Sequence, residues 1–168
     1  MSDYLLPAEL VDKAREVVAA NRASGRRVAV AESCTGGLVS AALTEIAGSS
    51  EMFEAGFVTY SNTAKMAALR VGDEVVETFG AVSIATAWAM ARGALEKSDA
   101  DVAVAITGVA GPDGGSDRKP VGTVIFARAE RGASDDEIMA DQKLFDASGG
   151  RSGVRLQAAL CALDLLMP

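Results

Sequence analysis

The sequence contains no histidine, and aromatic residues make up only 5% of its 168 amino acids. The missing imidazole excludes a Ser-His-Asp triad, a Cys-His pair and every histidine metal site. If the protein is a hydrolase, its proton shuttle must therefore be a lysine, a tyrosine or a carboxylate. The shortage of aromatic rings leaves alanine, valine and leucine to fill the core, and such small side chains favour close packing of helices on a sheet.

Cysteine and basic residues are also sparse. The two cysteines, Cys34 and Cys161, form no CxxC unit, so we expect neither a structural zinc site nor, in a reducing compartment, a disulfide. The formal net charge is −7 and no run of lysine and arginine offsets it, which disfavours nucleic acid as a partner. An anionic ligand must then be held locally, by backbone N–H groups and one or two well-placed cations.

Long apolar runs are missing too. No stretch approaches the ~20 consecutive apolar residues of a membrane span, and the first residues lack the basic and apolar regions of a signal peptide. We therefore expect a cytoplasmic protein with no membrane partner. The length suits one compact domain, residues 1–168. Its alanine-rich helices suit a homodimer or a higher homo-oligomer, although no face is identified.

Apolar periodicity and turn residues predict strands that alternate with helices. Strands are predicted at 28–32, 56–60 and 101–108, and a hairpin at 121–130 and 137–145. Helices are predicted from 7 to 25, from about 36 to 46, from 61 or 62 onward, over 73–80, over 84–97 and over 150–167. This order predicts an α/β fold: a three-layer α/β/α sandwich with a mixed, mostly parallel sheet and a C-terminal antiparallel hairpin.

Three polar loops follow predicted strands, at the edge where ligands of open α/β sheets bind. The first is SCTGG, residues 33–37. Ser33, Cys34 and Thr35 lie near a helix N-terminus, whose free N–H groups suit a developing oxyanion. Gly36 and Gly37 let a ligand approach the backbone. The same spacing also fits a serine or threonine that only caps the helix.

The second loop, YSNTAK at 60–65, offers a base. Lys65 falls in the first turn of its helix, where the helix dipole disfavours an ammonium, and burial would lower its pKa further. A neutral lysine can accept the proton of a serine hydroxyl, with Tyr60 as relay or orienting group. The alternative is that Lys65 is a solvated surface residue.

The third loop, TGVAGPDGGS at 107–116, begins where Thr107 and Gly108 end a strand. Its glycines, among them Gly111, expose N–H groups suited to an oxyanion or a phosphate, although the loop is neither a Walker A motif nor a GxGxxG fingerprint. A flexible surface loop is the alternative. Four cations nearby are candidate anion contacts or surface charges: Arg118, Lys119, Arg151 and Arg155.

Cys34 is a second candidate nucleophile, because a helix N-terminus lowers the pKa of a thiol. A thiolate would leave Lys65 unexplained, whereas a hydroxyl with a lysine base uses all three loops. We therefore prefer Ser33 as the nucleophile, with Cys34 as a small buried neighbour.

Several long motifs resemble the C-terminal domain of the competence-damage-inducible protein CinA. In order they are AESCTGG, IAGSS, GFVTYSNTAK, GAVS and ITGVAGPDGGS, the last followed by KPVGTV, and the likeness extends from about Pro7 to the end. Stand-alone domains of this family hydrolyse the carboxamide of nicotinamide mononucleotide to nicotinic acid mononucleotide and ammonia, without metal or cofactor, and so recycle pyridine nucleotide toward NAD. Relatives often carry an aspartate where this chain has Gly150.

The resemblance implies roles for individual residues. Ser33 would be the nucleophile, with Lys65 and Tyr60 as the other catalytic groups. The resemblance also places Thr107 and Gly108 at the site. To these we add, as oxyanion- or substrate-binding candidates of our own, Cys34, Thr35, Gly36, Gly37, Asn62 and Gly111. The candidate phosphate contacts are Arg118, Lys119 and Arg151. The alternative is a non-catalytic nucleotide-binding or competence-related partner-binding module that uses the same pocket.

Overall fold

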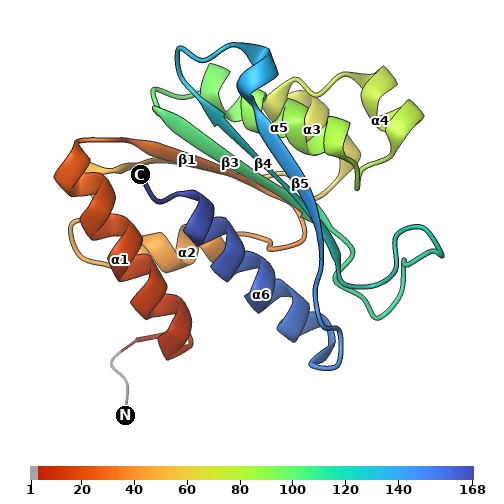
Figure 1. Ribbon diagram of the computed structural model, residues 1–168, viewed down its shortest axis with the longest axis horizontal. Helices are drawn as coiled ribbons and strands as arrows, with labels where there is room; N and C mark the ends of the chain where they lie inside the picture. The colour runs from red at the N-terminus through yellow and green to blue at the C-terminus, as the bar shows by residue number, and fades with distance from the viewer. Residues whose placement is uncertain (1–3) are drawn as a thin grey trace.

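The computed structural model describes residues 4–168, which form a five-stranded sheet flanked by helices on both faces (Figure 1). The strands, in the spatial order β2-β1-β3-β4-β5, are β1 (Val28–Glu32), β2 (Phe53–Val58), β3 (Val102–Gly108), β4 (Thr123–Glu130) and β5 (Met139–Leu144). β1 pairs in parallel with β2 and β3, whereas β4 is antiparallel to both β3 and β5. The predicted mixed sheet and hairpin are confirmed. Within these residues only β4 runs against the others, so the pairings divide evenly between parallel and antiparallel.

Three α-helices lie on each face of the sheet in the described part of the chain, which confirms the predicted layers (Figure 1). One face carries α1 (Ala8–Ser24), α2 (Leu38–Thr44) and α6 (Gly150–Leu165), and the other carries α3 (Asn62–Leu69), α4 (Asp73–Phe79) and α5 (Ile84–Glu96). Two short 3-10 turns, Ser49–Glu51 and Asp135–Glu137, complete the elements. No helix within residues 4–168 is long and apolar enough to cross a membrane.

The predicted boundaries of two elements that lead into the site were wrong. The helix expected from about residue 36 begins only at Leu38, because Gly36 and Gly37 have φ angles of +61° and +97° and form a turn instead. The strand expected at 56–60 begins earlier, at Phe53, and ends at Val58. Tyr60 therefore lies in a loop rather than in the sheet.

The alternation of valine and alanine divides the core between the two faces of the sheet, because successive strand residues point to opposite sides. The valines of β1 and β3 face α1, α2 and α6, while their alanines face α5. The residues are Val28, Val30, Val102 and Val104 on one face and Ala29, Ala31, Ala103 and Ala105 on the other. The small alanine side chains allow α5 to lie close to the sheet.

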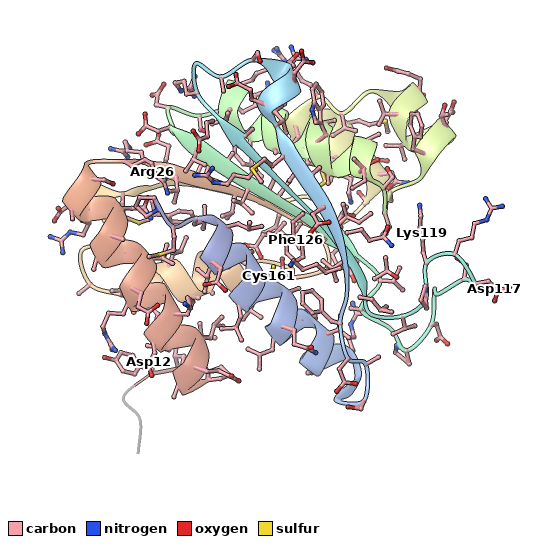
Figure 2. The ribbon with its side chains drawn as sticks, in the orientation of Figure 1. Asp12, Arg26, Asp117, Lys119, Phe126 and Cys161 are labelled. Carbon is pink, nitrogen blue, oxygen red and sulfur yellow. The ribbon has the colours of Figure 1, made fainter. Side chains whose placement is uncertain are left out.

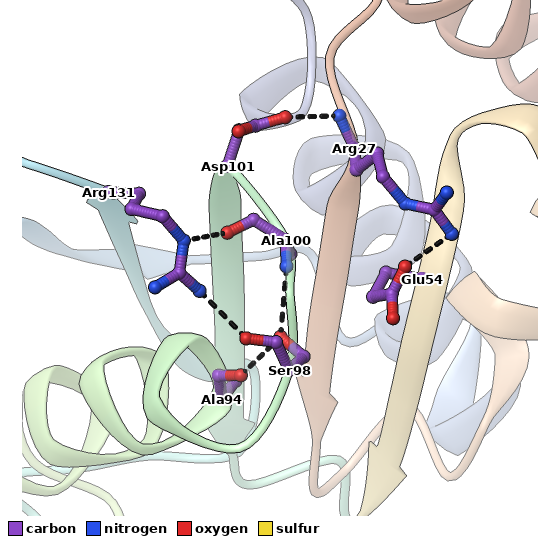
Figure 3. A network of polar contacts seen from close by, with 7 residues as sticks. All are labelled: Arg27, Glu54, Ala94, Ser98, Ala100, Asp101 and Arg131. Atoms are coloured by element: carbon purple, nitrogen blue, oxygen red, sulfur yellow. Dashed lines mark hydrogen bonds and ion pairs between the residues drawn. The ribbon is translucent and has the colours of Figure 1, made fainter.

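A polar network holds the sheet edge from which β1 and β3 start (Figure 3). The Arg131 guanidinium donates to the carbonyls of Ala100 and Ser98, at 2.7 Å each. The Asp101 carboxylate accepts the N–H of Arg27 at 2.7 Å. These contacts fix the N-terminal ends of the strands, and the three polar loops lie at the opposite edge.

We expect Gly93→Ala to destabilise the fold, because a Cβ at Gly93 in α5 would lie only 2.0 Å from the carbonyl oxygen of Leu69 in α3. Overpacking of this kind lowers the free energy of unfolding by about 1–3 kcal/mol. Gly153→Ala in α6 is the matched control: its Cβ meets no atom within 4 Å, and alanine favours a helix by up to ~1 kcal/mol over glycine. Urea unfolding followed by circular dichroism measures both. A shift of the same sign for the two variants would contradict this packing.

Candidate active site

Residues from all three polar loops line one pocket of about 280 Å³ at the C-terminal ends of β1 and β3. Eight of the predicted site residues line it: Ser33, Cys34, Tyr60, Lys65, Thr107, Gly108, Gly111 and Arg151. The rest of the lining comes from Ala81 and Val82, just before α5, and from Val109, Ala110, Asp113 and Gly114. The structure therefore brings together the hydroxyl, the amine and the phenol that the sequence predicted as catalytic groups.

Six predicted site residues do not line this pocket: Thr35, Gly36, Gly37, Asn62, Arg118 and Lys119. Thr35 is fully buried and Asn62 is exposed at the start of α3. Lys119 lies on the loop after β3, which projects from the body of the protein (Figure 2), and its Nζ is 3.4 Å from the carbonyl of Phe79. The roles proposed for these residues stay predictions, except that the Gly37 N–H is already bonded, to Glu32.

Lys65 is buried although it carries an amine: the residue is 1% exposed. Its Nζ lies 3.0 Å from Ser33 Oγ, 2.9 Å from the carbonyl oxygen of Thr59 and 3.2 Å from that of Tyr60. No ion pair within residues 4–168 includes it. Burial therefore lowers the pKa of the Lys65 ammonium below its ordinary value of 10.5.

The three oxygen neighbours of Lys65 Nζ suit both forms of the group: an ammonium has three N–H donors, and a neutral amine has two N–H donors and one lone pair. As the contacts stand, Nζ donates to the carbonyls of Thr59 and Tyr60 and to Ser33 Oγ. In the neutral form the two carbonyls take the two N–H groups, and the lone pair is left for the hydroxyl proton of Ser33. A charged ammonium has three donors and no lone pair, and it would hold Ser33 without deprotonating it. The two carbonyls therefore orient the amine as a general base requires.

Local sequence explains how Lys65 reaches this position. Ser61 is the N-cap of α3, and its hydroxyl accepts the N–H of Ala64 at 3.0 Å. The cap starts the helix at Asn62 and turns Lys65, its fourth residue, toward the sheet. The predicted start of this helix, at 61 or 62, is thus confirmed.

Arg151 joins the second and third loops at the mouth of the pocket. Its guanidinium donates to the Tyr60 hydroxyl at 2.5 Å and to the Gly111 carbonyl at 2.7 Å. Because the Tyr60 hydroxyl accepts from Arg151, its own proton remains available to another acceptor. The side chain of Tyr60 is also accessible, since the residue is 57% exposed.

Cys34 lines the same pocket, but its thiol is in the unreactive form. Burial raises the pKa of Cys34 to about 11, so the thiol stays protonated at neutral pH. The nucleophilic form of cysteine is the thiolate. This argues against Cys34 as the nucleophile and for Ser33, whose hydroxyl has the amine beside it.

The N–H groups at the start of α2 are occupied, which corrects the expectation that they face an oxyanion. Glu32, the fully buried last residue of β1, takes them. Its Oε2 accepts the N–H groups of Gly37 and Val39, at 3.1 Å each, and its Oε1 accepts the N–H and the hydroxyl of Ser40, at 2.9 and 2.8 Å. Sequence reasoning missed Glu32. The signal was an acidic side chain at the end of a buried strand, because such a carboxylate must find donors.

Gly108 supplies a backbone donor beside Ser33. The N–H of Val109 donates to the Thr123 carbonyl in β4 at 2.8 Å, and successive N–H groups of a strand point to opposite sides, so that of Gly108 points away from β4. On that side lies β1, which ends at Glu32. The next residue, Ser33, donates its N–H to the carbonyl of Ile106 at 2.9 Å. The Gly108 N–H therefore faces the open space next to Ser33. A side chain here would collide with β4, since its Cβ would lie 2.8 Å from the Thr123 carbonyl oxygen.

Comparison with known proteins agrees with the motifs. The CinA C-terminal domain model matches residues 11–168. The chain is 51% identical over 149 residues to the nicotinamide-nucleotide amidohydrolase PncC of Enterobacter agglomerans, a match that covers 89% of this chain and 88% of the relative. It is 48% identical over 159 residues to PncC of Escherichia coli strain K12, with 95% and 93% covered. The crystal structure of the competence/damage inducible protein CihA from Agrobacterium tumefaciens is similar, with a TM-score of 0.91, 46% identity, and 99% and 97% covered.

We expect Cys34 to resist alkylation in the folded protein. With a pKa near 11 its thiolate fraction at pH 8 is roughly 100-fold or more below that of an ordinary cysteine. Iodoacetamide labelling followed by peptide mass spectrometry compares Cys34 in the native protein with Cys34 in urea. Equal labelling rates in the two states would contradict the burial and pKa described above.

Proposed function

The chain belongs to the CinA C-terminal domain family, and from this membership we propose that it hydrolyses the carboxamide of nicotinamide mononucleotide, giving nicotinic acid mononucleotide and ammonia. Relatives at 48–51% identity are named for nicotinamide-nucleotide amidohydrolase activity. One observation carries the proposal: the 3.0 Å contact between Ser33 Oγ and the buried Lys65 Nζ. It offers a nucleophile and a base to a chain that has no histidine.

In the first half of the proposed reaction, Ser33 Oγ attacks the carboxamide carbon while the Lys65 amine takes the hydroxyl proton. A new C–O bond forms, and the carbonyl electron pair moves to the oxygen, which becomes an oxyanion. The Gly108 N–H is placed to donate to that oxygen. Transfer of a proton to the amide nitrogen then breaks the C–N bond, releases ammonia and leaves an ester on Ser33.

The proton for the leaving nitrogen has two sources in the pocket. The Lys65 ammonium, formed in the first step, is one, and its return to the neutral amine resets the base. The hydroxyl of Tyr60, held by Arg151, is the other or relays the proton. In the second half, Lys65 deprotonates a water that attacks the ester, and the proton then returns to Ser33 Oγ.

The proposed substrate carries a phosphate, and the chain as a whole carries a net charge of −7. A local cation must therefore offset the repulsion. Arg151 is the cation that lines the pocket among the three predicted phosphate contacts. Arg118 and Lys119 come from the projecting loop, and we propose them as secondary contacts. We also propose the cytoplasm as the location, which the free thiols of Cys34 and Cys161 support.

We expect both Ser33→Ala and Lys65→Arg to lower kcat by roughly 10³-fold or more. Arginine keeps the positive charge but is always protonated, so it has no lone pair with which to accept the serine proton. Release of ammonia and of nicotinic acid mononucleotide from nicotinamide mononucleotide, followed by chromatography, measures the rate.

Lys97→Arg is the control, because Lys97 is the C-cap residue that follows α5 and does not line the pocket. Circular dichroism verifies that each variant is folded. A Lys65→Arg variant with a near-normal rate would rule out the lysine base. Nucleotide binding by the unaltered protein without product would favour the binding module instead.

A further inference from the structure

The backbone of the first loop is held from two sides by opposite charges. The Glu32 carboxylate accepts from the N–H of Gly37, the last residue of the loop, and from those of Val39 and Ser40 just after it. From the other side, the Arg155 guanidinium of α6 donates to the carbonyls of Cys34 and Thr35, at 3.2 and 2.9 Å. We propose that Glu32 and Arg155 are positioning residues that keep Ser33 Oγ in contact with Lys65, an inference that rests on the proposed function of Ser33.

Glu32 replaces the cap that α2 lacks. The N-cap residue, Gly37, has no side chain to bond the first N–H groups of the helix. The carboxylate of Glu32 reaches over the loop and takes four donors, two on each oxygen. Each such bond to a charged acceptor is stronger than a neutral one. An amide in place of the carboxylate would turn an N–H₂ group toward other N–H donors, so the loop would have to move.

A shift of the first loop also shifts Ser33, because the backbone N–H and the backbone carbonyl of Ser33 are both hydrogen-bonded. Its N–H donates to the Ile106 carbonyl at 2.9 Å, and its carbonyl accepts the N–H of Gly36 at 3.0 Å. Only the side-chain torsion of Ser33 then stays free to place Oγ. A shift of the 33–37 backbone therefore changes the distance from Oγ to the amine of Lys65.

The planar guanidinium of Arg155, which has several N–H donors, suits the two carbonyls that it contacts. Its guanidinium reaches two neighbouring carbonyls at once, and its Nη2 would lie 3.5 Å from a Cβ on Gly36. Lysine offers a single point of charge and cannot hold two carbonyls in the same way. These hydrogen bonds join α6 to the first loop, and α6 also carries Arg151, which lines the pocket.

Neither Glu32 nor Arg155 lines the pocket. A substitution at either residue therefore leaves the surface that meets the substrate intact and changes only how Ser33 is held. The two residues should consequently affect the rate of the chemical step rather than the affinity for the substrate.

We expect Glu32→Gln and Arg155→Met to lower kcat about 100-fold, the effect of a misplacement of about 1 Å, while KM for nicotinamide mononucleotide changes by less than about threefold. Arg155→Lys should recover part of the loss. Glu96→Gln, which removes an exposed carboxylate paired with Arg92 at the far end of α5, is the matched control and should leave both constants unchanged.

A second readout does not depend on the nucleotide: the rate at which a fluorophosphonate probe labels Ser33, followed by mass spectrometry. Labelling should slow in Glu32→Gln and Arg155→Met in parallel with kcat. If the unaltered protein labels at Ser33 but releases no ammonia, the proposed substrate is wrong, and the labelling rates of the variants still decide whether the loop is held as proposed.

Circular dichroism and thermal unfolding separate positioning from folding. Folded variants with normal kcat and normal labelling would overturn the proposal, even if they unfold at a lower temperature. Should Glu32→Gln fail to fold, the comparison of Arg155→Met with Arg155→Lys decides alone: equal, near-normal rates in both would overturn it, and a graded loss would support it.

Discussion

A buried amine with hydrogen bonds and no carboxylate partner is the constraint on which the rest of this site depends. Burial disfavours the charged ammonium and therefore lowers the pKa of Lys65. Between that lowered pKa and 10.5, the unfolded chain binds more protons than the folded protein, so the free energy of unfolding falls as the pH is lowered through this window. The fold gives up this stability to keep the Lys65 amine next to Ser33. The carbonyls of Thr59 and Tyr60 accept hydrogen bonds from this amine.

The sheet supplies the frame for this arrangement. Parallel β1, β2 and β3 end at one edge, so the loops that follow them meet there. The polar network of Arg131 and Asp101 holds the opposite edge (Figure 3). Two side chains from outside the pocket, Glu32 and Arg155, bond the backbone of the loop that carries Ser33. The reacting groups are thus few, and a larger set of contacts holds them in place.

Much of the fold could be predicted from the sequence, because its signals are local. The alternation in VAVAE and VAVAITG indicates strands with two buried faces, and Ser83 caps α5 by accepting the N–H of Thr86 at 3.1 Å. The pairing of Ser33 with Lys65 could also be predicted, since parallel strands bring their following loops together. The absence of histidine left few other bases to consider.

The remaining features depend on contacts between distant residues or on loop geometry. Arg155 reaches the first loop from more than a hundred residues away along the chain, which no local pattern reveals. Glu32 turns its carboxylate to the helix start, and this removes donors that the sequence seemed to offer to an oxyanion. The glycine-rich loop after β3 also carries Lys119 to a place that its composition does not determine (Figure 2).

The central claim is that the amine of Lys65 is neutral where Ser33 needs a base. A carbon-13 NMR titration of the Lys65 ε-carbon, assigned by comparison with Lys65→Arg, measures this directly. The account predicts that this carbon titrates below pH 10.5. A Lys65 that titrates at or above 10.5, and so stays an ammonium throughout the neutral range, would contradict it.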